Sequence, residues 1–163
     1  NVPLAIMTAD CLPVLLTDVQ GTVVAAAHAG WRGLLAGVLE NTIAAMQRAP
    51  AELLVYLGPA IGADAFEVGA EVRDAFVAQD AAADEAFVIS TSADMGVHIT
   101  PSQLKYRANL GGLAGMRLKK QGVRQIFGGG VCTYKDTAHF FSHRHASQQN
   151  KATGRFASVI WRM

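Results

Sequence analysis

The sequence predicts a layered α/β domain in which a mixed β-sheet is flanked by helices. Short apolar segments of strand length alternate with longer segments whose apolar residues recur at helical spacing. Two of the short segments follow each other across Gln20-Gly21, where we expect a tight hairpin turn. Because strands joined by such a turn run antiparallel, the sheet should be mixed rather than purely parallel.

Length and composition indicate one domain over residues 1–163. The chain is 51% apolar and 17% charged, a balance typical of a compact protein with a sizeable core. An apolar strand is predicted at residues 2–7, with no turn, cap or polar lead before it. We therefore expect a natural segment to precede residue 1.

The other elements follow from apolar periodicity and from helix-breaking residues. Helices are predicted over 31–48, ended by Pro50, over 68–79, and over 102–121 with Ser102 as N-cap and Gly122 as C-cap. Strands are predicted at 53–57, 87–89, 123–127 and 156–161. Loops or linkers are predicted at 58–62, 81–85, 91–101 and 145–153.

The hairpin region, residues 8–33, carries the first candidate site. If Gln20-Gly21 forms the centre of the turn, Cys11 lies opposite Gly30, and His28 lies two positions along on the same face. A thiolate and an imidazole so placed can share one metal ion, or act as nucleophile and base. A register shifted by one residue would put them on opposite faces of the sheet.

Residues near this pair are candidates for supporting roles. Asp10 could orient the His28 imidazole by accepting a hydrogen bond from it. Arg32 and the unpaired N–H groups at the start of the predicted 31–48 helix suit an anion such as phosphate, although Arg32 could equally pair with a surface carboxylate. A second polar cluster at 139–145 contains Arg144, which could contact a substrate, and histidines whose spacing suits metal ligands only loosely.

Composition argues against several classes of protein. No run approaches the ~20 apolar residues of a membrane span, and the start lacks the pattern of a signal peptide. The net charge is +1, and the basic cluster at 117–124 suits a helix C-terminus better than nucleic acid. Two cysteines, Cys11 and Cys132, do not make a disulfide framework. We therefore expect a cytoplasmic protein that binds neither membranes nor nucleic acid.

Six motifs follow one another across nearly the whole chain. They are TADCLPVLL, AAAHAGWRG, LGPAIG with FEVG, GGxxCTY, FFSHR and TGRFASVIW. In this combination the chain closely resembles the YfiH family, also called the multicopper polyphenol oxidase or laccase-domain family. The resemblance implies an α/β sandwich related to the fold of cytotoxic necrotising factor toxins.

The resemblance also implies a metal held by one cysteine and two histidines. Cys11 of the TADC motif and His28 of the HAGW motif match two of these ligands. The family's third ligand is a histidine upstream of the TADC motif, which this chain does not contain, so His143 and His145 are candidate substitutes. Residues 105–112 depart from the family, whose members generally carry an acidic residue and a tyrosine there, so the substrate pocket is least certain at this segment.

Family membership would imply a zinc-dependent purine nucleoside phosphorylase, with adenosine deaminase and methylthioadenosine phosphorylase activities. The alternatives are a copper-dependent polyphenol oxidase and a peptidoglycan precursor editing factor. One thiolate and two imidazoles with an open fourth position are typical of catalytic zinc, whereas several coppers need more histidines than the five present.

On this interpretation Cys11 and His28 hold zinc, and Arg32 neutralises phosphate. The nucleoside would lie across the loop that begins at Gly58, with Arg144 and Arg155 as substrate contacts or supporting residues. We expect small-molecule partners, namely a purine nucleoside and phosphate, and a monomer or weak homo-oligomer.

Overall fold

A four-stranded mixed sheet lies at the centre of the computed structural model, which describes residues 2–90 and 104–162. Its strands run in the order β3-β2-β4-β8, namely β3 (Val24–Ala29), β2 (Leu12–Asp18), β4 (Leu53–Leu57) and β8 (Gln125–Gly128). Strand β2 is antiparallel to both β3 and β4, whereas β4 and β8 are parallel. The predicted mixed sheet is therefore confirmed.

The β2–β3 hairpin has the register that the sequence predicts. Leu12 lies opposite Ala29, and Pro13 lies opposite His28. The connection is longer than the tight turn we expected, because it spans residues 19–23. The longer connection does not change the register, because residues 18 and 23 still pair at the end of the hairpin. The Asp18 N–H donates to the Val23 carbonyl at 3.3 Å.

The Asp18 carboxylate organises the hairpin loop. It accepts hydrogen bonds from the Thr22 N–H at 2.7 Å, from the Val23 N–H at 3.1 Å and from the Thr22 hydroxyl. Arg48, beyond the next helix, adds a contact from its Nε at 3.4 Å. A buried carboxylate thus supplies the acceptors that a five-residue loop needs for its own N–H groups.

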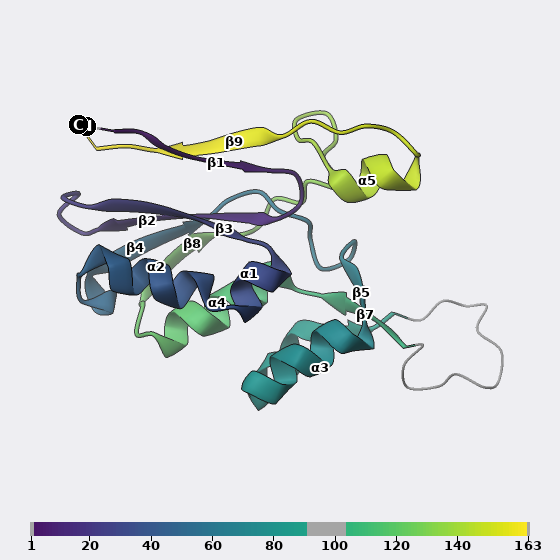
Figure 1. Ribbon diagram of the computed structural model, residues 1–163, viewed down its shortest axis with the longest axis horizontal. Helices are drawn as coiled ribbons and strands as arrows, with labels where there is room; N and C mark the ends of the chain where they lie inside the picture. Colours follow the sequence, from purple (N-terminus) through teal and green to yellow (C-terminus); the bar gives the residue numbers. More distant parts are fainter. Residues whose placement is uncertain (1, 91–103, 163) are drawn as a thin grey trace.

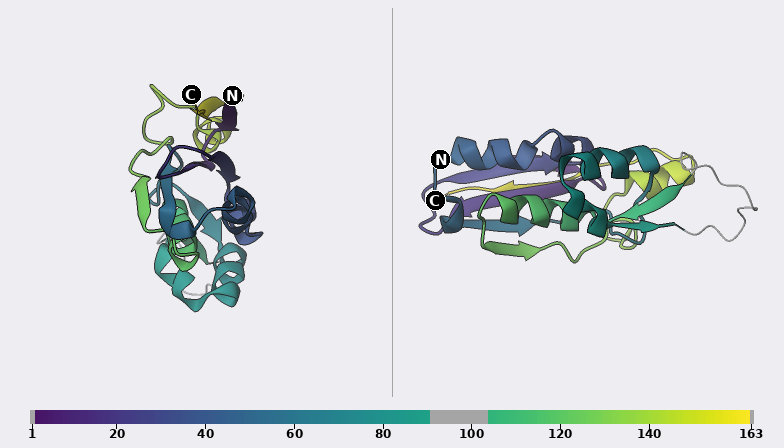
Figure 2. Two further views of the ribbon diagram at one scale, coloured as in Figure 1. Left: turned by 90° about the vertical axis from the view of Figure 1, so that its left-hand side faces the viewer. Right: turned by 90° about the horizontal axis from the view of Figure 1, so that it is seen from below.

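The two faces of the hairpin meet different layers. Leu12, Val14 and Leu16 are at most 1% exposed and belong to a core that they share with residues of the helices. These helices cover one side of the sheet (Figure 1). On the opposite side, β1 (Leu4–Thr8) pairs antiparallel with β9 (Phe156–Ile160) to form a separate two-stranded layer (Figure 2). Apolar side chains remain exposed on this layer, including Met7, Val159 and, just after β9, Trp161.

The prediction of one long helix at 31–48 is wrong, because the structure has two helices there. α1 (Trp31–Leu35) and α2 (Val38–Met46) are separated at Gly37, which has a left-handed φ of 82°. Glycine adopts this conformation without the steric penalty that a Cβ would bring. Pro50 begins a short 3-10 helix, η1 (Pro50–Glu52), that leads into β4.

A second sheet, in the order β5-β7-β6, lies beside the central one with helix α3 packed on it (Figure 1). Its strands are β5 (Glu67–Gly69), β7 (Lys105–Ala108) and β6 (Phe87–Ile89). Consequently the helix predicted at 68–79 begins only at Ala70, as α3 (Ala70–Gln79). The linker predicted at 81–85 is a 3-10 helix, η2 (Ala81–Ala86), in which Ala83 and Ala86 are buried.

Two further expectations need correction. The helix predicted from 102 begins later, as α4 (Leu110–Lys120), because residues 105–108 pair in β7 and Asn109 accepts the Gly112 N–H as N-cap. The polar loop predicted at 145–153 begins inside α5 (His143–Gln148), which Ser142 caps. The expected loop at 91–101 and Ser102 lie outside the described residues.

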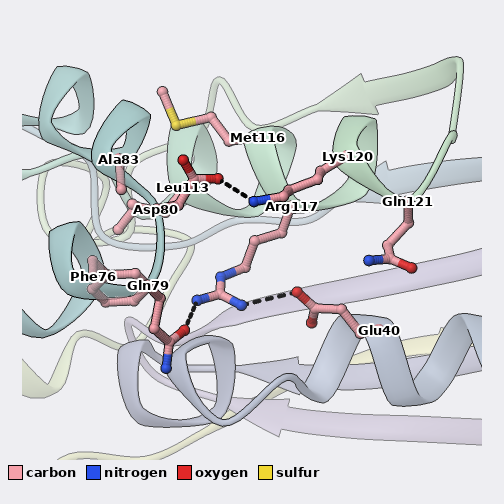
Figure 3. A pocket seen from close by; sticks show the side chains of 10 residues that line it. All are labelled: Glu40, Phe76, Gln79, Asp80, Ala83, Leu113, Met116, Arg117, Lys120 and Gln121. Atoms are coloured by element: carbon pink, nitrogen blue, oxygen red, sulfur yellow. Dashed lines mark hydrogen bonds and ion pairs between the residues drawn. The ribbon is translucent and has the colours of Figure 1, made fainter.

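Two basic residues of the last turn of α4, Arg117 and Lys120, contact neighbouring helices. Arg117 donates to Glu40 of α2 at 2.9 Å and to the Gln79 side chain of α3 at 2.7 Å (Figure 3). Lys120 pairs with Asp80 at 2.8 Å across the same hollow. Their position at a helix C-terminus agrees with the expectation from the sequence.

Among residues 2–90 and 104–162, no helix has the length and apolar character that crossing a bilayer requires.

We predict that Asp18→Asn destabilises the protein at neutral pH but has little effect in strong acid. Hydrogen bonds from Thr22, foremost its hydroxyl, lower the pKa of Asp18 from 3.8 to about 2. Because the folded-state pKa is depressed, the stabilisation is present above about pH 4 and is lost as the pH falls through about 2. Thermal melts of both proteins across this range test it. The exposed Asp74→Asn change is the matched control, and parallel pH profiles for wild type and Asp18→Asn would contradict the prediction.

Candidate functional site

A pocket of about 130 Å³ opens where the β2–β3 hairpin meets α1, α5 and the second sheet. Residues from six separate stretches of the chain line it. They are Ala9, Asp10, Cys11, Gly30, Trp31, Ile61, Phe66, Leu110, His143 and Arg144. Aromatic and aliphatic side chains make up one part of the wall, and Asp10, Cys11, His143 and Arg144 supply its polar groups.

Cys11 and Gly30 approach each other closely at the open end of the hairpin. A Cβ placed on Gly30 would lie 2.9 Å from the Cys11 Sγ, so glycine leaves the space that the sulfur occupies. Continuing the register of Leu12 with Ala29 by one residue puts Cys11 opposite Gly30. By the same alternation, Cys11 and His28 belong to one face of the hairpin.

The surroundings of Cys11 disfavour a free thiolate. Burial raises the pKa of the Cys11 thiol, and the negative charge of Asp10 raises it further, while Arg155 acts in the opposite direction. A thiol in this setting stays neutral until a cation offsets the burial. Both roles open to Cys11, metal ligand and nucleophile, need the thiolate, so either one needs a neighbouring positive charge.

Asp10 is held in a strained conformation and uses both carboxylate oxygens. Its φ of 86° is uncommon for a residue other than glycine, and its side chain is buried. Oδ1 accepts from the Thr133 hydroxyl at 2.7 Å, and Oδ2 accepts from the Arg144 backbone N–H at 2.6 Å. The observed bonds of Asp10 therefore go to Thr133 and Arg144, not to the His28 imidazole as we expected.

Arg144 is fixed at both ends across the pocket wall. Asp10 holds its backbone, and its guanidinium donates to the Glu67 carbonyl at 2.9 Å. The guanidinium carbon lies 6.0 Å from the centre of the Phe66 ring, at the limit of a cation–π contact. Of the predicted substrate contacts, Arg144 is the one on the described wall of this pocket.

Other predicted site residues lie around the pocket without lining it. His28 is exposed on the hairpin, and the exposed Arg32 stacks its guanidinium 4.2 Å over the Trp31 ring. Gly58 is buried against Pro13, where a Cβ would lie 2.7 Å from the proline ring, so its observed role is close packing. Arg155 is close enough to influence the Cys11 pKa.

The helix start next to Arg32 is a weaker anion site than expected. α1 has five residues, because the predicted 31–48 helix breaks at Gly37. A helix this short carries little of the dipole that would favour phosphate at its N-terminus. Any phosphate here would therefore depend mainly on arginine side chains.

The histidines differ in their access to Cys11. His143 shares the pocket with Cys11, whereas His145 packs against Tyr134 at 5.5 Å and contacts Gln149 at 2.6 Å. Of the two candidate substitutes for a third ligand, His143 is thus the nearer to the site. Within residues 2–90 and 104–162, no three His, Cys, Asp or Glu side chains gather closely enough to hold a metal ion.

Reasoning from the sequence missed three residues of this region. Phe66 and Leu110 line the pocket, and Thr133 anchors Asp10. Phe66 and Thr133 each belong to a recognised motif, FEVG and GGxxCTY, which was the available signal. Leu110 lies in the 105–112 segment, which departs from the family pattern and so gave no prediction of a pocket residue.

The family model described as multi-copper polyphenol oxidoreductase laccase matches residues 1–163. The chain belongs to this family. It is 54% identical over 161 residues to a purine nucleoside phosphorylase of Pseudomonas aeruginosa, covering 99% of this chain and 61% of that protein. It is 52% identical over 157 residues to the purine nucleoside phosphorylase YfiH of Escherichia coli, covering 96% and 58% respectively.

Solved structures of family members have the same fold. A Neisseria meningitidis protein of the family DUF152 superimposes with a TM-score of 0.85 at 51% identity, covering 99% of this chain and 60% of that one. YlmD from Geobacillus stearothermophilus gives 0.78 at 28% identity, covering 99% and 57%. The predicted fold class and the YfiH resemblance are confirmed. The chain spans about three-fifths of the length of these relatives.

We predict that Gly30→Ala displaces Cys11 and destabilises the protein by about 1–3 kcal/mol, the usual effect of overpacking. The added methyl group would lie 2.9 Å from the sulfur, so the side chain of Cys11 must move. Thermal unfolding gives the loss of stability, and the alkylation rate of Cys11 reports its displacement. Gly115→Ala in α4 is the control, because its Cβ would meet nothing within 4 Å and should stabilise the helix slightly. Unchanged alkylation in Gly30→Ala would contradict the proximity of the two residues.

Proposed function

We propose that this chain supplies one wall of the active site of a purine nucleoside phosphorylase, in which Cys11 and His28 are two ligands of a zinc ion. The observation that carries the proposal is the hairpin register, which assigns these two residues to the same face beside a pocket lined by aromatic rings. The names of the relatives that are 54% and 52% identical support the reaction class. Adenosine and methylthioadenosine are further candidate substrates of the same pocket.

The donor set fits part of a zinc site. Catalytic zinc takes three protein ligands and keeps one position open, and a thiol and an imidazole on one face provide two of the three. The third would be the histidine that precedes the TADC motif in the family, with His143 as the alternative within this chain. When bound, zinc would offset the burial and the Asp10 charge that keep the Cys11 thiol neutral, and would polarise an oxygen of the substrates.

The apolar half of the pocket suits the purine base. Trp31 and Phe66 present aromatic rings, and Ile61 and Leu110 close the wall with aliphatic groups. Arg32 lies over the Trp31 ring, so this ring stays in place without a ligand. A planar base can stack on such a wall, which would add roughly 1–3 kcal/mol of binding.

The polar half of the pocket suits the reacting groups. In phosphorolysis a phosphate oxygen attacks the ribose C1′, and the base leaves with the electron pair of the broken C–N bond. Arg155, which acts on Cys11, and Arg32 lie around the pocket rather than on its wall, and they are the cations suited to hold phosphate beside it. His143 on the pocket wall is an imidazole able to give the leaving base a proton.

The first test is turnover by the purified protein. Inosine or adenosine with phosphate should yield free base and ribose 1-phosphate, and Cys11→Ala should reduce the rate by at least about 100-fold if its ligand role is as proposed. Cys132→Ser is the matched control, because Cys132 accepts the Gly62 N–H at 3.2 Å and a serine can do the same. Elemental analysis should find zinc in the wild type and less in Cys11→Ala. Normal turnover by Cys11→Ala would reject the proposal.

The second test addresses the base-binding wall. Phe66→Leu keeps an apolar side chain but removes the ring, so KM for inosine should rise about tenfold through lost stacking. The KM for phosphate should stay within about twofold, because the phosphate site lies elsewhere. Phe127→Ala on β8 is the control, since that ring is 55% exposed and outside the pocket. Equal changes in both KM values would place the base on another surface.

A copper-dependent phenol oxidase is the second candidate, favoured by the description of the matching family model. Copper in the elemental analysis, with oxidation of a phenolic dye and no phosphorolysis, would support it in place of the phosphorylase. Absence of turnover together with tight binding of a nucleotide-linked cell-wall precursor would instead support an editing factor.

A further inference from the structure

We propose that Asp10 is a positioning residue that holds Arg144 in the wall of the pocket and thereby sets the surface on which the base is bound. The proposal rests on the proposed function for its substrate and goes beyond it by giving Asp10 a role independent of His28. Asp10 directly precedes Cys11, and Arg144, the second residue of α5, lies 134 positions later in the sequence. One carboxylate thus connects the cysteine segment to the opposite wall.

The carboxylate of Asp10 connects three segments of the chain by hydrogen bonds: its own, that of Thr133 and that of Arg144. Oδ1 accepts from the Thr133 hydroxyl at 2.7 Å and Oδ2 from the Arg144 N–H at 2.6 Å, and all three groups are at least partly buried. Ser142 caps α5 separately by accepting from the His145 N–H. The Asp10 bond is therefore additional to the ordinary N-cap of this helix.

Fixing the Arg144 backbone fixes its side chain as well. The guanidinium reaches Glu67 at 2.9 Å and lies over Phe66, so Arg144 spans from the start of α5 to the second sheet. Releasing the backbone end would free this side chain to leave Phe66, the ring to which we assign base stacking. Asp10 thus acts on the base through Arg144.

The backbone of Asp10 supports a role for its side chain. At a φ of 86° a glycine would be unstrained, whereas an aspartate is strained by its Cβ. Strain of this kind persists where surrounding contacts enforce it, and it concentrates at functional sites. Of the two side-chain contacts here, the one to Arg144 leads to the wall of the pocket.

The test compares two variants in which residue 10 can adopt the observed left-handed backbone conformation. Asp10→Gly fits the left-handed conformation but removes both acceptors. Asp10→Asn also tolerates it, and an amide can keep both bonds by accepting from Arg144 and donating to the Thr133 oxygen. We expect KM for inosine to rise about tenfold in Asp10→Gly and only a few-fold in Asp10→Asn, with kcat within about twofold. Asp74→Asn, a matched change on the exposed face of α3, should change neither.

Two further measurements separate positioning from a merely structural effect. Hydrogen exchange of the α5 amides should quicken in Asp10→Gly while that of α4 stays as in the wild type. In a double-mutant cycle, Arg144→Ala should raise KM similarly, and the combined variant should be no worse than Arg144→Ala alone. Additive effects on KM, or unchanged exchange in α5, would overturn the proposal.

These readouts also distinguish this proposal from the function on which it rests. If the wild type turns over no nucleoside, the proposed function fails, and exchange in α5 alone decides whether Asp10 holds Arg144. If Cys11→Ala abolishes turnover but Asp10→Gly leaves KM unchanged, the function stands and the role of Asp10 is refuted.

Discussion

The register of the β2–β3 hairpin is the constraint on which the rest of the structure depends. Side chains alternate between faces along a strand, so one register assigns every residue of both strands. Leu12, Val14 and Leu16 are at most 1% exposed and pack in the core with residues of the helices. A shift by one residue would turn these three side chains out of that core, to the opposite face of the sheet. The same shift would move Cys11 away from the face of His28, so core packing and the candidate site are specified together.

Local patterns predicted the hairpin and the buried strands because their information lies within a few residues. The strand at 53–57 and the closing strand from residue 156 were correct for this reason. The hairpin loop is longer than predicted, yet the register is unchanged, because the Asp18 carboxylate accepts hydrogen bonds from the loop N–H groups of Thr22 and Val23. Where alternation and turn residues agree, the expected pairing needed no knowledge of the remaining chain.

The helix boundaries were predicted less well because tertiary contacts override periodicity. The predicted 31–48 helix has an apolar stripe throughout, yet Gly37 adopts a left-handed conformation and divides it. Residues 105–108 alternate polar and apolar side chains over only four positions, and they form β7 between β5 and β6 rather than part of the predicted helix. Similarly, short polar segments such as 145–153 resemble loops until a cap like Ser142 and a contact like that of Asp10 stabilise a helical turn.

The candidate site shows the same division between local and distant information. Cys11 and Gly30 could be paired from the turn alone, but the partners of Asp10 are Thr133 and Arg144, which no spacing rule connects to it. Their meeting has a chemical consequence, because the carboxylate that closes the pocket wall also raises the pKa of the adjacent buried thiol. The side chain that holds Arg144 therefore also favours the neutral form of the Cys11 thiol. The shape of the pocket wall and the protonation of its sulfur are linked through this one carboxylate.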